Sequence, residues 1–202
     1  MQIVLQVSEE PTTLRKESDA LLDNDRFFDF CAQNPDMRIE RSAEGEIIVM
    51  PPPGGESSHQ NNEIAIELGL WARKDGRGQV FDSSGYFTLP NGAARSPDAS
   101  WVRKSRLERL NRRQKRRPLP LCPDFVIELK SPSDRLKALR AKMNEWIENG
   151  AELAWLIDPD RRTVTIYRPG REPEQLVNPD VVVGEGPVEG FKIEMSEIWE
   201  GI

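Results

Sequence analysis

Apolar positions recur with a helical period in three parts of the chain. Leucines and phenylalanines are spaced this way between 13 and 34, and Asn34-Pro35-Asp36 ends that pattern. A second stripe consists of Ile64, Leu68 and Trp71, and a third stripe is followed by Gly150. The pattern therefore predicts helices over these segments: Thr13 to about Asn34 (as one helix or two short ones), Ser57 or Ser58 to about Lys74, and Asp134 to Asn149.

Shorter apolar runs between turn residues predict strands. Met37–Arg41 and Glu46–Met50 flank Ala43-Glu44-Gly45 and are typical of a hairpin. Asp124–Lys130 follows several prolines and is rich in apolar residues. The other predicted strands are Val80–Phe81, Gly85–Leu89, Asp98–Val102, Leu153–Ile157 and Thr163–Tyr167. Because the strands gather between helices, we predict an α/β or α+β domain with a central mixed sheet.

The length of 202 residues fits one domain with a short extension. We therefore predict an N-terminal helical extension over residues 1–36 and a single domain over 37–202. No apolar run approaches the roughly 20 residues that span a bilayer, and Met1–Val7 is too short and uncharged for a signal peptide. We expect a cytoplasmic protein without a membrane partner.

Cysteine and histidine usage excludes several kinds of site. Cys31 and Cys122 lie far apart and form no CxxC pair, which argues against a disulfide framework and a thiolate zinc site. His59 is the only histidine, so a multi-histidine metal site is excluded and any Ser-His-Asp triad would need this residue. An enzyme with this composition would rely mainly on carboxylates and lysines.

The net charge of −6 argues at first against a nucleic-acid partner. However, residues 103–117 hold nine Lys or Arg and one acid, so this segment carries +8 and the rest of the chain −14. Such a segment can concentrate a polyanion, although a solvated loop without a partner is the alternative. We predict that it contacts phosphates near the catalytic cleft, through Arg103, Lys104, Arg112, Arg113, Lys115, Arg116 and Arg117.

Candidate chemistry lies on the strand that contains Glu128 and Lys130. Side chains alternate along a strand, so these two are expected on one face, opposite an apolar face. A second predicted strand begins with Pro97-Asp98, and Asp98 and Glu128 can meet from adjacent strands. Two such oxygen ligands suit Mg²⁺, and Lys130 beside the ion can orient or help deprotonate a water. This arrangement favours metal-assisted phosphodiester hydrolysis, whereas a local Glu128–Lys130 ion pair is the alternative.

The pattern Pro97-Asp98 … Glu128-Leu129-Lys130 resembles the PD-(D/E)XK nuclease superfamily. From Met37 to Tyr167, and most specifically at Gly150-Ala151-Glu152 and Trp155–Pro159, the chain is similar to the Uma-type (Uma-two) family of restriction endonucleases. The resemblance implies a restriction-endonuclease-like core of sheet and helices, and dependence on Mg²⁺ or Mn²⁺. It also implies Asp98 and Glu128 as metal ligands, with the carbonyl of Leu129 completing the set, and Lys130 as the catalytic lysine.

The resemblance also assigns expectations to residues outside this pattern. Many relatives use a lysine of the following helix, where this chain has Lys142, whose alternative role is to cover apolar neighbours. His59 is expected to face the cleft and touch phosphate, and Glu63 to add a carboxylate to the metal site. Asp124 is either structural or a replacement for Asp98.

Together these features predict a metal-dependent endonuclease that hydrolyses DNA. The resemblance implies a homodimer in which each subunit cuts one strand. The alternative is an inactive nuclease fold that binds nucleic acid or protein, which would fit the −14 charge outside the basic segment. Nothing in the sequence distinguishes DNA from RNA. Metal binding separates the two classes, because an inactive module need not bind Mg²⁺.

Overall fold

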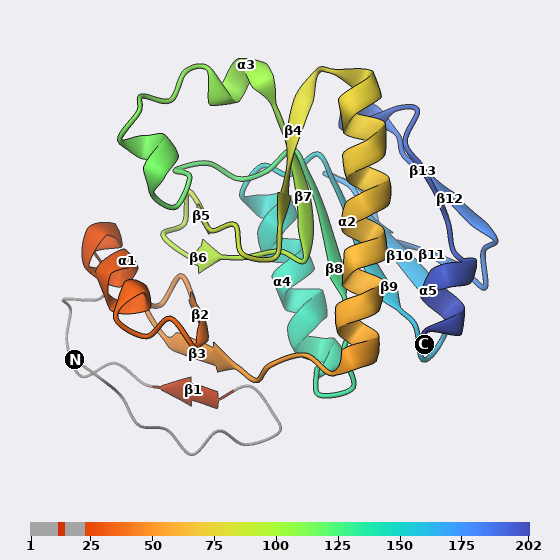
Figure 1. The fold of residues 1–202 in the computed structure, drawn as a ribbon, viewed down its shortest axis with the longest axis horizontal. Coiled ribbons are helices and arrows are strands. Elements are labelled where there is room, and N and C mark those ends of the chain that lie inside the picture. Colours follow the sequence, from red (N-terminus) through yellow and green to blue (C-terminus); the bar gives the residue numbers. More distant parts are fainter. Residues whose placement is uncertain (1–11, 15–22) are drawn as a thin grey trace.

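The computed structural model describes residues 12–14 and 23–202, in which a mixed six-stranded sheet forms the centre (Figure 1). Its strand order is β11-β10-β9-β8-β7-β4, with β8 and β9 parallel and the other pairs antiparallel. The central mixed sheet predicted from the sequence is therefore confirmed. The strands are β4 (Gly78–Asp82), β7 (Ala99–Arg103), β8 (Phe125–Leu129), β9 (Leu153–Asp158), β10 (Thr163–Tyr167) and β11 (Glu174–Val177).

Two long helices cover opposite faces of this sheet (Figure 1). On one face, Ile64 of α2 (Gly55–Asp75) belongs to the same buried cluster as Ile127 of β8. On the other face, Met143 of α4 (Leu136–Glu148) belongs to a cluster with Val126, the neighbour of Ile127. The alternation of β8 thus supplies both layers of the core. The C-terminal part of the chain adds to the core on the face that α2 covers. It consists of a hairpin of β12 (Val181–Val183) and β13 (Lys192–Glu194) and two short helices, η3 (Gly186–Val188) and α5 (Ser196–Glu200).

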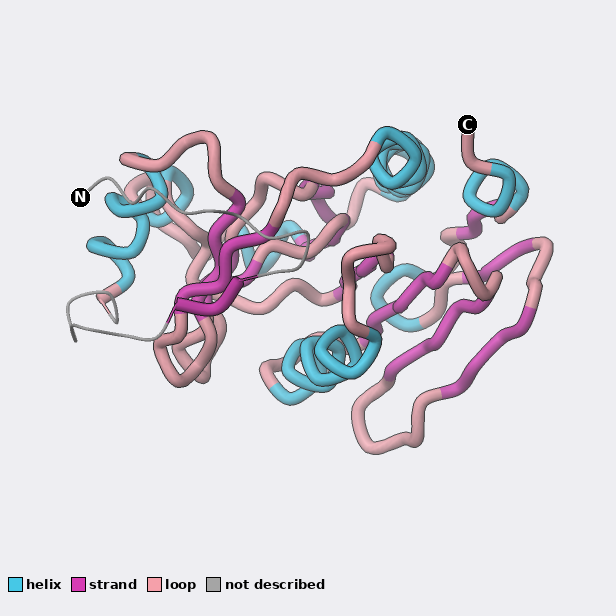
Figure 2. The backbone as a smooth tube through the Cα atoms, turned by 90° about the horizontal axis from the view of Figure 1, so that it is seen from below, coloured by secondary structure: helices cyan, strands magenta, loops and turns pink. Residues whose placement is uncertain are grey.

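A second sheet lies to one side of the first (Figure 2). Its order is β1-β3-β2-β6-β5, and the predicted hairpin forms its β2–β3 pair. Helix α1 (Asn24–Ala32) packs Phe27 and Phe30 into one cluster with Ile39 of β2. The strands are β1 (Thr12–Leu14), β2 (Arg38–Arg41), β3 (Ile47–Met50), β5 (Phe87–Thr88) and β6 (Ala94–Arg95).

Of the predicted N-terminal helical segment, the described residues form one helix, α1. Helix α1 begins at Asn24, where the side chain of Asp23 accepts a hydrogen bond from the Arg26 backbone and caps the helix. Thr13 and Leu14, which were predicted within a helix, belong to β1 and pair with β3. The predicted positions between 15 and 22 lie outside the described residues. The apolar spacing is ambiguous here because a short run can satisfy either a helix or a strand.

Two further features bear on the predictions. The basic segment begins as α3 (Lys104–Leu107) and includes the short helix η2 (Gln114–Arg116). Within the described ranges, no helix has both the length and the apolar character needed to cross a membrane.

Candidate active site

The antiparallel pairing of β7 and β8 brings Asp98 and Glu128 to the same end of the sheet. Ala99 is registered with Ile127, so the residue before Ala99 lies beside the end of β8. The backbone N–H of Leu129 donates a hydrogen bond of 2.8 Å to Oδ2 of Asp98. Asn61 of α2 donates a longer one, 3.4 Å, to Oδ1. The structure therefore brings together the two carboxylates that the sequence predicted from adjacent strands.

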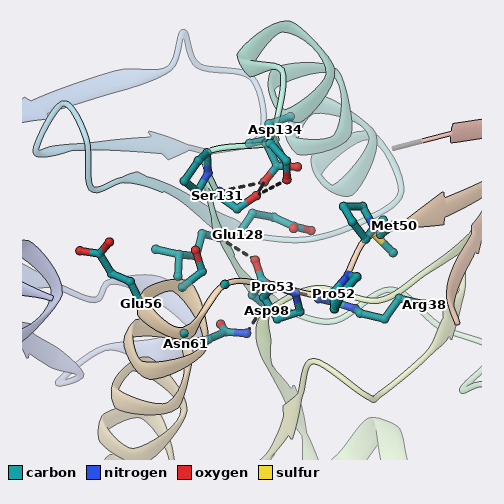
Figure 3. Close-up of a pocket in the computed structure, with 18 of the residues that line it drawn as sticks. Arg38, Met50, Pro52, Pro53, Glu56, Asn61, Asp98, Glu128, Ser131 and Asp134 are labelled. Atoms are coloured by element: carbon teal, nitrogen blue, oxygen red, sulfur yellow. Dashed lines mark hydrogen bonds and ion pairs between the residues drawn. The ribbon is translucent and has the colours of Figure 1, made fainter. Parts of the chain in front are cut away.

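These carboxylates lie in a pocket of about 840 Å³ (Figure 3). One wall is the proline run before α2 together with the first turn of that helix. The opposite wall is the loop that joins β8 to α4. Arg38 and Met50 line it from the second sheet, so the pocket lies where the two sheets and both long helices meet.

The side-chain ammonium group of Lys142 contacts the carboxylate of Glu128. Its Nζ lies 2.9 Å from Oε1 and 3.1 Å from Oε2 of Glu128. Trp146, one helical turn later, donates its indole N–H to the same Oε1 at 2.8 Å. Because residues four apart share a helix face, α4 directs two donors at one carboxylate. Trp146 thus anchors Glu128 beside Lys142.

The second sheet completes the charge network with residues that the sequence reasoning missed. Glu40 of β2 lies 2.9 Å from Nζ of Lys142, and its other oxygen lies 3.1 Å from Arg95 of β6. The backbone N–H of Ser96 donates to Glu40 at 3.0 Å. Arg95 also contacts Glu145 of α4 at 2.6 Å. Lys142 is thus held between Glu128 and Glu40.

The ionisation of these groups reflects burial opposed by local charge. Burial raises the pKa of Glu128 to about 7, although Lys142 acts in the opposite direction. Burial also raises the pKa of Asp98, despite Arg38, Lys142 and the Leu129 N–H. For Glu40, Lys142 and Arg95 outweigh burial and lower the pKa to about 2. The pocket therefore keeps two carboxylates that their neighbours neutralise incompletely.

The side chain of Lys142 keeps its proton and its positive charge. Burial alone would lower its pKa, but the carboxylates of Glu128 and Glu40 outweigh burial and raise it. Its ammonium group also donates to the backbone carbonyl of Ser96 at 3.3 Å. Lys142 therefore acts as a cation that fixes Glu128, and it is unsuited to remove a proton from water.

Lys130 does not line the pocket that holds Glu128, contrary to the expectation that the two side chains share one face and act together. The alternative, an ion pair between them, is not formed among the described residues. Strand β8 ends at Leu129, and the ammonium group of Lys130 lies 2.8 Å from Asp160 and 3.8 Å from Asp158. It lines a neighbouring hollow with Gln60 and Trp199. The lysine that reaches the carboxylate pocket is Lys142.

The accessory candidates lie outside the pocket. His59 and Glu63 are half-buried on α2, and neither lines the pocket. Asp124 is buried at the opposite end of β8, where it accepts the backbone N–H of Arg103 at 2.9 Å and lies 3.1 Å from Arg106. Asp124 thus binds the start of the basic segment, in agreement with the structural alternative for this residue.

The basic segment lies at the far end of the sheet from the pocket, which corrects its predicted place near the cleft. β7 begins at Ala99, directly after Asp98 at the pocket, and ends at Arg103 beside Asp124, and α3 follows at the top of Figure 1. None of the predicted phosphate-contacting residues of this segment lines the pocket. Arg113 and Arg117 contact Asp25 of α1 at 2.7 and 2.6 Å.

The donor set of the pocket fits a small divalent cation. The described residues contain no group of three or more His, Cys, Asp or Glu side chains arranged to hold a metal ion. A site here would use the two carboxylates and a backbone carbonyl at Leu129. Mg²⁺ suits such a site, because it is commonly bound by one or two carboxylates and retains water or phosphate oxygens.

Comparisons with known proteins agree with this fold. The Uma2 family model, described as "Putative restriction endonuclease", matches residues 25–196. One similar solved structure is titled as a putative nuclease belonging to DUF820 from Anabaena variabilis, with a TM-score of 0.68 and 24% identity over 80% of this chain and 89% of that chain. At that identity, the likeness shows a shared fold. A search of curated proteins finds no match.

Proposed function

Because the chain belongs to the Uma2 family, we propose that it is a divalent-metal-dependent endonuclease that hydrolyses DNA phosphodiester bonds. The family match confirms the resemblance seen in the sequence and supports a nuclease function. The observation that carries the finer proposal is a pair of carboxylates, the partly buried Asp98 and the buried Glu128, that face one pocket with raised pKa values. Incompletely neutralised carboxylates of this kind favour a divalent cation.

In this proposal, Asp98, Glu128 and the carbonyl of Leu129 hold Mg²⁺ or Mn²⁺. The ion supplies charge stabilisation and lowers the pKa of water. Trp146 and Lys142 fix the carboxylate of Glu128, and the charge of Lys142 favours negative charge that develops beside it. We therefore propose Lys142, in place of Lys130, as the lysine on which cleavage depends, and its role is to fix Glu128 and not to assist the water. The homodimer and the cytoplasmic location stay predictions.

Cleavage of supercoiled plasmid with Mg²⁺ or Mn²⁺ tests the assignment of the lysine. We expect Lys142→Gln to lower the rate about 10–100-fold, the usual loss when a group that supports a metal ligand is removed. Lys130→Ala and Lys137→Ala, an exposed lysine of the same helix, are expected to cleave like the wild type. Circular dichroism of each variant reports whether the fold is retained.

If Lys130→Ala alone lost plasmid cleavage and Lys142→Gln did not, Lys130 would be the lysine on which cleavage depends. Wild-type protein that binds DNA and a divalent cation without cleaving would contradict the nuclease proposal. DNA binding without metal binding would favour the inactive binding module instead.

We keep the basic segment as a DNA-binding surface outside the pocket, and neutralising Arg112, Arg113, Arg116 and Arg117 should weaken binding. Arg113 and Arg117 also hold Asp25, whereas no ion pair of Arg112 or Arg116 occurs within the described ranges. Arg112→Ala with Arg116→Ala is therefore the cleaner variant. We expect the slope of log K against log salt to fall by about two, one for each phosphate contact.

Binding is measured with a fluorescent duplex over a salt series. A double variant of exposed cations elsewhere, Arg171→Ala with Lys192→Ala, makes the same charge change and serves as the control. Equal slopes for both double variants would remove the basic segment from the DNA interface.

A further inference from the structure

The pocket needs a cation that meets the phosphate group of a substrate, and two candidates line it, Arg38 and Lys142. The ammonium group of Lys142 has three donors, and it already contacts three acceptors: Glu128, Glu40 and the Ser96 carbonyl. It therefore has no donor left for a further ligand. The basic segment lies at the other end of β7.

Arg38 is placed and oriented for this task. It begins β2, where Arg38 and Glu40 share one face and Ile39 points to the opposite one, into the core beneath α1. Its strand partner is Met50, and both residues line the pocket (Figure 3). The same strand face thus supplies Glu40 to the buried network and Arg38 to the open space.

The guanidinium group of Arg38 keeps its donors available. Its Nη2 lies 3.7 Å from Oδ1 of Asp98, which is beyond hydrogen-bond distance. Within the described part of the chain, no hydrogen bond of this side chain is formed. The Arg38 side chain is 32% exposed and that of Asp98 15%. Arg38 can therefore turn toward a ligand without breaking a hydrogen bond.

We propose that Arg38 binds a phosphate oxygen of the nucleic-acid backbone inside the carboxylate pocket, exchanging its loose contact with Asp98 for the phosphate. This inference rests on the proposed function for the identity of the polyanion. A guanidinium group suits the ligand because its planar donors match two oxygens of one phosphate. Once Arg38 has turned away, Asp98 is free of its nearest cation.

The test measures duplex DNA binding in EDTA, so that neither metal nor cleavage contributes. We expect Arg38→Ala to weaken binding about tenfold, the size of one lost charge-assisted contact, and to lower the salt slope by about one. Arg38→Lys should recover part of the affinity, because a point charge replaces the fork. The control is Arg73→Ala, an exposed guanidinium in the last turn of α2, far from its pocket end.

A second variant separates phosphate binding from simple neutralisation of Asp98. In an Asp98→Asn background there is no carboxylate charge for Arg38 to neutralise. If neutralisation were its only role, Arg38→Ala would leave DNA binding unchanged in that background, and this result would overturn the proposal. A phosphate contact predicts the same roughly tenfold loss in that background. Equal affinities of Arg38→Ala and Arg73→Ala would also overturn it.

These outcomes are distinct from failure of the proposed function. If the wild-type protein bound DNA but did not cleave it, the nuclease proposal would fail, while a loss of binding in Arg38→Ala would still support the phosphate contact. If cleavage required Glu128 but DNA binding ignored Arg38, the nuclease would stand without this contact.

Discussion

Glu128→Gln is expected to abolish metal binding and cleavage. Glutamine keeps the shape of the side chain and an oxygen that can accept from Trp146, but it removes the negative charge that would attract a divalent cation. It also places an amide donor where Oε2 of Glu128 now accepts from Lys142 at 3.1 Å. Lys142 then keeps Glu40 as its carboxylate partner.

The loss of function should exceed the roughly 10–100-fold that removal of a supporting residue costs, because a ligand itself is lost. Plasmid cleavage and calorimetric titration with Mn²⁺ give the two readouts, and thermal melting in EDTA reports whether the fold is retained. Glu148→Gln, an exposed acid of α4, is the control and should change neither readout. Mn²⁺ binding that persists in a folded Glu128→Gln variant would contradict the metal-site proposal.

The meeting of Asp98 and Glu128 could be predicted because it depends on strand pairing near apolar runs, which periodicity detects. The place of Lys130 could not. Alternation puts Lys130 and Glu128 on one face only while the strand continues, and β8 ends between them at Leu129. Beyond that point, nearby Asp160 determines where the flexible lysine side chain lies.

The contribution of the second sheet could be predicted only in part. The hairpin of β2 and β3 was visible in the sequence, and Arg38 and Glu40 on either side of Ile39 form the alternation that could have identified both charged residues. Arg95 gave no such signal, because β6 has only two residues and its partner β2 lies far away in the sequence. Long-range pairing of this kind leaves no local pattern.

The position of the basic segment relative to the pocket could not be predicted from composition. The excess of positive charge between 103 and 117 is evident from the sequence. Its distance from the pocket follows from the direction of β7, whose five residues span about 16 Å at the usual rise of a strand. The predicted place near the cleft is therefore wrong, because a strand carries the chain from Asp98 to the other end of the sheet before the basic segment begins.

The expected effect of Glu40→Ala is a loss of about 3–5 kcal/mol in the free energy of unfolding. Glu40 is 2% exposed, and its two oxygens accept from Lys142, Arg95 and the Ser96 N–H. Its removal leaves two largely buried cations with one carboxylate fewer. Because the folded-state pKa of about 2 lies below the ordinary value of 4.5, this carboxylate stabilises the fold above pH 4.5, and the contribution is lost as the pH falls toward 2.

Urea denaturation at neutral pH measures this loss, with the slope m compared between variants to detect any change in the unfolded state. Glu44→Ala makes the same change of charge four residues later, at an exposed position, and should stay within about 0.5 kcal/mol of the wild type. If the two variants were equally stable, the buried network would not hold the second sheet to the central one. A large loss in Glu40→Ala alone would mean that the second sheet, through Glu40, fixes the lysine that contacts Glu128, so the pocket requires both sheets.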